Sequence, residues 1–151
     1  MGAIMEFATE KQIASFLSTC RIEGQKNFLM AFKKKTWLKS FIDFFIVGGS
    51  YYVQSSVKPK ILAFTPKGIY LMDISDVIEN HSNQVLEKPW NQVKDFTYKP
   101  VLNTVRLSWN YQNEACIFSV DVGQLSQHVG QYQFNKEHYD YLAQQDFFRS
   151  K

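Results

Sequence analysis

Hydrophobic positions near the N-terminus follow the spacing of an amphipathic helix. They stand at i, i+3, i+4 and i+7 and are Ile13, Phe16, Leu17 and Cys20. Thr9 precedes Gln12 by three residues, which is the arrangement of a capping box, where each side chain accepts a hydrogen bond from the backbone of the other residue. This pattern predicts a helix over about residues 9–22.

The central part of the chain, about residues 27–123, consists of short apolar or alternating segments that are typical of antiparallel strands. We expect strands at residues 27–32, 51–57, 60–65, 69–74, 93–98, 104–110 and 115–122. Pro66 and Gly68 suit the second and fourth positions of a tight turn and predict a hairpin. Residues 111–114 should link the last two strands in the same way. The polar residues 76–89 predict a long surface loop.

Near the C-terminus the pattern returns to that of a helix, over about residues 135–148. Asn135 is expected to cap it, with Phe134 and Tyr139 forming a hydrophobic staple around the cap. Its predicted apolar face consists of Tyr139, Leu142, Ala143 and Phe147. The order of helix, strands and closing helix predicts one α+β domain over residues 1–151, mostly antiparallel β, in which the last helix covers the open end of the sheet.

Two segments resemble the bacterial pleckstrin-homology-like (PH-like) domain family. Residues 61–71, Ile-Leu-Ala-Phe-Thr-Pro-Lys-Gly-Ile-Tyr-Leu, are similar to a pair of apolar strands that this family joins by a short basic hairpin. Residues 89–96, Pro-Trp-Asn-Gln-Val-Lys-Asp-Phe, are similar to the strand that follows. The resemblance implies a PH-like barrel or sandwich capped by a C-terminal helix, with an extra N-terminal helix. It also implies a binding or scaffolding role.

Composition narrows the class of protein further. The chain has 151 residues, of which 45% are hydrophobic and 16% aromatic, so it can bury the core of one domain and is not expected to be disordered. Two distant cysteines, Cys20 and Cys116, do not form a disulfide framework and are expected to be buried free thiols. Because the N-terminus lacks a secretion signal, we expect a cytoplasmic protein, with peripheral attachment to the inner membrane face left open.

Catalytic motifs are not found in the sequence. His81, His128 and His138 lack metal-ligand spacing, and we expect them to be exposed to solvent. There is no P-loop and no nucleophile elbow. We therefore expect no enzyme activity, no cofactor and no metal. Nucleic acid is not expected either, because one basic cluster is too little for phosphate-backbone binding.

Basic and aromatic residues come together in one segment, within a first 60 residues that carry nine basic and four acidic side chains, a net +5. The candidate surface binding residues are Lys33, Lys34, Lys35, Trp37, Lys39 and Phe41. Whether residues 33–50 form a helix, a strand or a loop stays open. Four lysines near an anionic bilayer contribute roughly 4 kcal/mol, so membrane attachment would also need inserted aromatic rings. The simpler interpretation is that the rings pack into the core and the lysines are solvated, and a third is contact with another protein chain.

Two functional hypotheses follow. The first is a non-catalytic binding or scaffolding module that acts through its surface, with a protein partner or self-association favoured over an anionic membrane. The second is a small-molecule-binding protein or enzyme with an aromatic-lined pocket between the sheet and a helix, because such pockets are lined by apolar rings. Its candidate lining residues are Tyr51, Tyr52, Trp109 and Tyr111.

Overall fold

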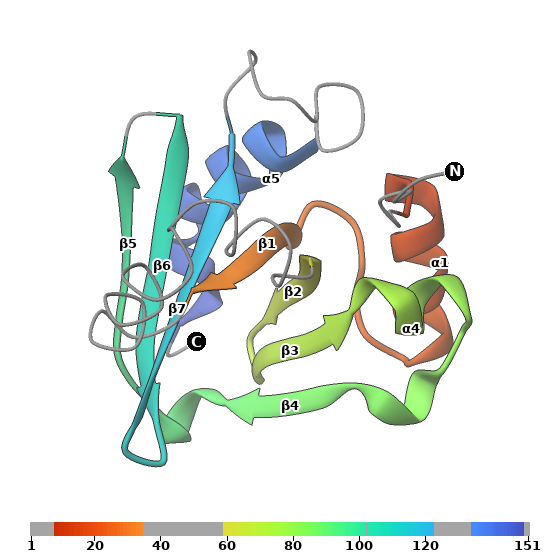
Figure 1. Ribbon diagram of the computed structural model, residues 1–151, viewed down its shortest axis with the longest axis horizontal. Coiled ribbons are helices and arrows are strands. Elements are labelled where there is room, and N and C mark those ends of the chain that lie inside the picture. The colour runs from red at the N-terminus through yellow and green to blue at the C-terminus, as the bar shows by residue number, and fades with distance from the viewer. Residues whose placement is uncertain (1–7, 35–58, 102, 123–133, 150–151) are drawn as a thin grey trace, which may run out of the picture.

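A computed structural model of the chain describes residues 8–34, 59–101, 103–122 and 134–149. Figure 1 shows an antiparallel sheet of seven strands, in the order β4-β3-β2-β1-β7-β6-β5. The strands are β1 (Phe28–Lys34), β2 (Pro59–Thr65), β3 (Gly68–Asp73), β4 (Leu86–Pro89), β5 (Val93–Val101), β6 (Thr104–Tyr111) and β7 (Glu114–Asp121). The helices are α1 (Glu10–Thr19), α4 (Ile74–Ile78) and α5 (Phe134–Gln144), with 3-10 turns η1 (Ser82–Gln84), η2 (Trp90–Gln92) and η3 (Asp146–Phe148). The predicted α+β class with a C-terminal helix is confirmed.

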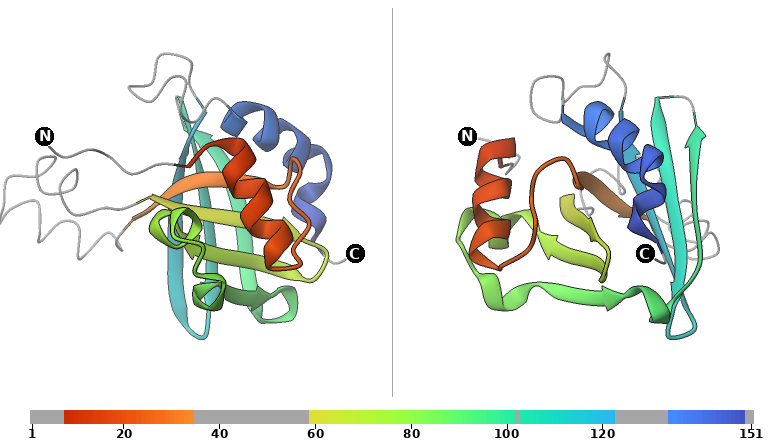
Figure 2. Two further views of the ribbon diagram at one scale, coloured as in Figure 1. Left: turned by 90° about the vertical axis from the view of Figure 1, so that its right-hand side faces the viewer. Right: turned by 180° about the vertical axis from the view of Figure 1, so that it is seen from behind.

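Strands β1, β2 and β3 are covered on both faces. On one face they pack against α1 and α4, in a cluster that contains Phe16, Phe28 and Ile61. On the other face they pack against β5–β7 and the C-terminal half of α5, in a second cluster that contains Leu29 and Leu62. Figure 2 shows α1 lying across the first of these faces and α5 on the other side of the molecule. Burial on both sides explains why these strands are nearly continuous apolar runs rather than alternating ones.

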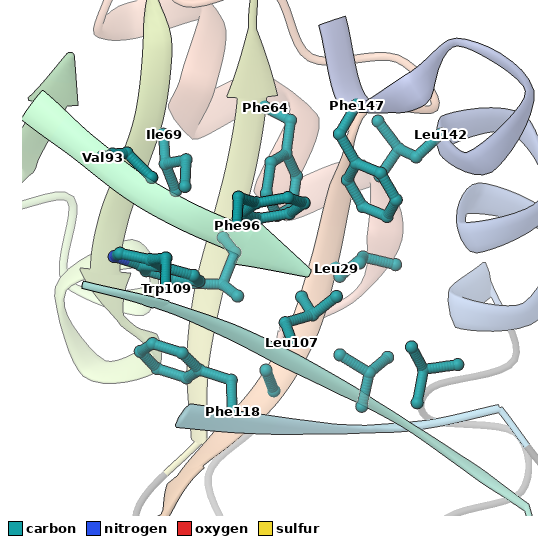
Figure 3. Close-up of a cluster of buried hydrophobic side chains, with 14 residues drawn as sticks. Leu29, Phe64, Ile69, Val93, Phe96, Leu107, Trp109, Phe118, Leu142 and Phe147 are labelled. Atoms are coloured by element: carbon teal, nitrogen blue, oxygen red, sulfur yellow. The ribbon is translucent and has the colours of Figure 1, made fainter. Parts of the chain in front are cut away.

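The second cluster contains five aromatic rings among aliphatic side chains (Figure 3). Trp109 lies between Phe96 and Phe118, with ring centroids 5.9 and 5.2 Å away and interplanar angles of 24° and 18°. Phe147 closes the cluster from the helical side, with its ring centroid 4.9 Å from that of Phe64. These rings fill the space between the sheet and the C-terminal segment.

Local sequence signals correctly predicted α1 and the two hairpins. The Thr9 hydroxyl accepts a hydrogen bond from the backbone N–H of Gln12 at 3.1 Å, and the Gln12 side chain accepts one from Thr9 at 2.9 Å. The β2–β3 turn closes at the Thr65–Gly68 pair, as its proline and glycine predicted. The β6–β7 turn has positive φ at Gln112 and Asn113, which matches the strand twist that a two-residue hairpin needs.

The prediction of a loop over residues 76–89 is wrong. This segment contains the end of α4, the turn η1 and strand β4, which pairs with β3. Ile74 and Val77 are buried and hold α4 against α1 and β3, whereas the side chains that surround them in the sequence are polar or exposed. Two buried apolar positions in a helix of five residues are too few to produce a periodic signal.

The predicted cap of the closing helix is also wrong, although the predicted start of the helix lies within one residue of the observed one. Helix α5 begins at Phe134, and Asn135 lies inside it with its side chain bonded to strand β1 rather than capping the helix. Phe134 packs against Phe28 instead of forming a staple with Tyr139, with the ring centroids 5.4 Å apart. The helix ends at Gln144, and the next turn carries positive φ at Asp146, Phe147 and Phe148. This reversal of handedness lets Phe147 reach the core, where it is fully buried.

Several predictions fall outside the described residues. They concern the expected strand at 51–57, the conformation of residues 35–50, and His128. Among the helices that the structure describes, none is long and apolar enough to cross a membrane.

Candidate functional site

The predicted basic and aromatic cluster is only partly covered by the structure. Lys33 and Lys34 are the last two residues of β1, and the Lys33 side chain is exposed. Lys35, Trp37, Lys39 and Phe41 lie outside the described residues, as does the side chain of Lys34. The part that can be placed is therefore the end of β1 at Lys33.

Two lysines from different strands, Lys33 and Lys88, act on the same thiol, Cys116 of β7. Burial raises the pKa of this thiol, the positive charges of Lys33 and Lys88 offset part of the rise, and the Glu114 carboxylate adds to it. Lys88 lies on the face of a neighbouring ring, with its Nζ atom 4.1 Å from the ring centroid of Tyr111. We call Lys33, Lys88, Tyr111 and Cys116 the basic end of the sheet. Its thiol stays protonated at neutral pH, which argues against a role as a nucleophile.

Of the residues expected to line a pocket, the structure describes Trp109 and Tyr111, and these two lie in different surroundings. Trp109 is 1% exposed and stacked inside the aromatic cluster. Tyr111 is half-buried at the basic end, and its hydroxyl donates a hydrogen bond to the side-chain oxygen of Gln92 at 3.0 Å. Tyr51 and Tyr52 lie outside the described residues. Trp109 thus belongs to the core, and the aromatic density of the sequence is largely explained by packing.

Both outer strands of the sheet carry features that hinder pairing with another strand. Strand β4 has only four residues. Strand β5 is irregular between Lys94 and Thr97. It also carries Pro100, and the Arg149 Nη1 atom donates a hydrogen bond to the carbonyl of Phe96 at 3.0 Å. Short strands, bulges, prolines and edge lysines all disfavour the addition of a further strand.

Asn135 of α5 makes three side-chain hydrogen bonds and lies where β1 separates from β7. The paired register of these strands begins at Ala31 and Val120, so the preceding residues of β1 have no partner in β7. Asn135 replaces that partner: its Oδ1 accepts from the Met30 N–H at 2.9 Å, and its Nδ2 donates to the Met30 carbonyl at 2.9 Å and the Asp121 carbonyl at 3.1 Å. The side-chain amide thus continues the ladder by the length of one peptide group.

His138 lies one helical turn beyond Asn135 and also contacts the backbone of β1. It is fully buried, so the prediction that it is exposed is wrong. Its Nδ1 is 2.8 Å from the Phe28 carbonyl oxygen, and its Nε2 is 3.1 Å from a Glu10 carboxylate oxygen. His81, by contrast, is exposed as predicted. His138 therefore joins α5 to β1 through one ring nitrogen and to α1 through the other.

Glu137 adds a second carboxylate next to His138. One ligand atom each from Glu10, Glu137 and His138 lie within 4.8 Å of one another. The Glu137 carboxylate is also 3.5 Å from the Lys26 ammonium group, and both side chains are more than half exposed. We call Glu10, Glu137 and His138 the histidine–glutamate cluster. It has one buried member and two that are open to solvent.

The sequence did not reveal this cluster because Glu10 is 128 residues away from His138, although Glu137 is its direct neighbour. A signal was nevertheless present. Phe134, Asn135, His138 and Leu142 share the buried face of α5, so two polar side chains occupy positions that normally hold apolar ones. A buried polar group is expected to have a hydrogen-bonding partner, but the helix pattern alone could not identify that partner as β1 or α1.

Comparisons with known proteins add no family to these observations. No protein-family model matches the chain, and no curated protein matches it.

Proposed function

We propose that this chain is a non-catalytic PH-like binding module that holds a protein partner with an acidic surface at the basic end of the sheet. The strand order β4-β3-β2-β1-β7-β6-β5 and the closing helix α5 support the resemblance to the PH-like family. The sequence segments behind that resemblance form β2, β3 and the connection from β4 through η2 into β5.

The observation that carries the proposal is the filled interior. The space between the sheet and the C-terminal segment holds the stacked rings of Phe96, Trp109 and Phe118, and Phe147 closes it. Binding through a filled core would require the rings to move apart, which costs several kcal/mol of packing. Binding at the surface needs no such change, so it has better support than the pocket hypothesis.

The surface features favour side-chain contacts over strand addition. Both outer strands disfavour pairing with another chain. Strand β4 is short, and strand β5 has a bulge and a proline. At the basic end, the positive charges of Lys33 and Lys88 both act on the Cys116 thiol. Two lysines contribute about 2 kcal/mol at an anionic bilayer, which is too little for stable attachment. An acidic protein surface can add hydrogen bonds and apolar contacts to the same charges.

Fluorescence anisotropy with a labelled poly-glutamate peptide, used as a model acidic surface, tests this proposal. We expect salt-dependent binding that is weakened by Lys33→Glu. Lys99→Glu on the outer strand β5 makes the same charge change away from the basic end and should match the unchanged protein. Binding that both variants weaken equally would reflect net charge and would contradict the proposal.

Two further measurements separate the competing functions. Sedimentation with phosphatidylserine vesicles tests the membrane alternative, and binding to vesicles without binding to the peptide would overturn the protein-partner proposal. Light scattering of the free protein tests self-association. Monomers at high concentration agree with a heterologous partner, whereas a dimer dissociated by Lys33→Glu would replace that partner with a second copy of the chain.

A further inference from the structure

We propose that the histidine–glutamate cluster binds a divalent transition-metal ion, held by the Nε2 atom of His138 and the carboxylates of Glu10 and Glu137. The ligand atoms of these residues already lie within 4.8 Å of one another. A mixed set of imidazole and carboxylate ligands suits zinc and neighbouring metals better than magnesium or calcium, which prefer oxygen alone. This site is independent of the binding function proposed for the basic end.

The first argument concerns the direction of the imidazole lone pair. The Nδ1 atom of His138 is 2.8 Å from the Phe28 carbonyl oxygen, and a carbonyl can only accept a hydrogen bond. Nδ1 must therefore carry a proton, which in the neutral ring leaves the lone pair on Nε2. That lone pair faces the Glu10 carboxylate oxygen at 3.1 Å. Electron pairs that point at one another repel, so either a proton on Nε2 or a metal ion must lie between them, and the second carboxylate, Glu137, supplies the further ligand that a metal ion needs.

The second argument is that the histidine ring is held in place before any ion binds. Its centroid lies 4.7 Å from that of Phe28 at an interplanar angle of 86°, and 5.1 Å from that of Phe134. A ligating histidine usually donates its other N–H to a carbonyl or carboxylate, which fixes both the tautomer and the ring orientation. The hydrogen bond from His138 to Phe28 has this form.

The geometry needs only small movements of exposed side chains. Ligand atoms around a tetrahedral zinc ion lie roughly 3.4 Å apart, given metal–ligand distances near 2.0–2.1 Å. His138 and Glu10 are already this close, at 3.1 Å. The side chains of Glu10 and Glu137 are 52% and 62% exposed, so they can rotate and an ion can reach them from solvent. Three protein ligands leave the remaining coordination positions to water.

Lys26 provides an internal test of the arrangement. Its ammonium group is 3.5 Å from the Glu137 carboxylate and competes with a metal ion for the same negative charge. Removing this lysine should therefore strengthen metal binding, whereas removing a ligand should weaken it. A purely structural contact between α1 and α5 would not produce opposite effects on zinc affinity.

Isothermal titration calorimetry of the full chain with zinc chloride measures the affinity for zinc and tests the proposal. We expect one site whose affinity falls by at least about tenfold in Glu10→Gln and in Glu137→Gln, because even partners outside the first ligand shell contribute that much. Lys26→Gln should raise the affinity. Glu23→Gln, an exposed glutamate outside the cluster, is the matched control and should leave the affinity unchanged.

His81→Ala removes the most obvious competing site, because His81 lies 3.5 Å from both Asp76 and Glu79. Zinc binding that disappears in this variant but survives Glu10→Gln and Glu137→Gln would overturn the proposal. No zinc binding to the unchanged protein would also overturn it, and a proton shared between His138 and Glu10 would then be the cation between the two groups. A rise in thermal unfolding temperature with zinc, lost in Glu137→Gln, provides a second readout.

Discussion

Replacing Asn135 by alanine tests whether α5 is held to the sheet by hydrogen bonds or mainly by apolar contacts. The side chain is fully buried and makes three hydrogen bonds, two to the backbone of Met30 and one to the carbonyl of Asp121. Alanine keeps the helix and removes little apolar area. The main consequence is that the N–H and C=O groups of Met30 lose this partner in a region where Met30 is only 1% exposed.

The expected loss of stability follows from the cost of buried polar groups without partners. Each costs about 1–3 kcal/mol, so the two groups of Met30 together cost about 2–6 kcal/mol. The Asp121 carbonyl is less deeply buried and adds less. We therefore expect Asn135→Ala to lower the free energy of unfolding by about 3–5 kcal/mol, a large part of the roughly 5–15 kcal/mol typical of a domain.

Urea unfolding followed by tryptophan fluorescence measures this loss. Lys136→Ala, one residue away on the exposed side of α5, is the control; it removes an exposed ion pair with Asp140 and should cost under about 0.5 kcal/mol. Asn135→Asp has nearly the same size but places an acceptor against the carbonyls of Met30 and Asp121. It should be at least as destabilising as alanine. A loss below about 1 kcal/mol for alanine, or a milder effect for aspartate, would refute the hydrogen-bonding argument.

Three further predictions concern other parts of the fold. Phe147→Ala should destabilise the protein by about 3–5 kcal/mol in the same assay, because it empties a fully buried ring position; an effect below about 1 kcal/mol would show that the core closes without it. Gly68→Ala should disrupt the pairing of β3 with β4, because the added Cβ would lie 2.3 Å from the Lys88 carbonyl oxygen, and faster amide exchange in β4 would report it. Burial and the hydrogen bond to Glu87 raise the pKa of Tyr70 from 10.0 to about 12. The folded state thus retains this proton longer than the unfolded state, so stability should be complete below pH 10 and fall as the pH rises towards 12, less so in Tyr70→Phe. Equal alkaline loss in both proteins would contradict this.

The elements that the sequence predicted are those whose signals lie within a few neighbouring residues. The capping box and apolar stripe of α1, the turn around Pro66 and Gly68, and the alternation in β6 depend on local geometry. The structure bears out each of them. The prediction of a loop over residues 76–89 was wrong because α4 and β4 are short. They are stabilised by contacts with other elements rather than by their own sequence pattern.

The candidate sites also combine features that the local sequence predicted with features that depend on contacts in space. Lys33 was predicted as a binding residue from a run of lysines, and the structure places it, exposed, at the end of β1. Lys88, the other lysine of the basic end, comes from a segment predicted to be a loop. Trp109 was considered as a pocket residue on the basis of aromatic content, but its position between two rings could be known only from the packing of three strands.

By itself, the sequence determined the α+β class, the first helix, the hairpins and the alternating faces of the strands, because these depend on periods of two to four residues. The tertiary structure decided the roles of Asn135 and His138. All of their hydrogen-bonding partners except the Asp121 carbonyl are on β1 and α1, more than one hundred residues away along the chain. A polar side chain on an apolar helix face can cap the helix, bind a ligand or form a hydrogen bond to another element. The groups that folding brings next to the side chain decide which of these it does.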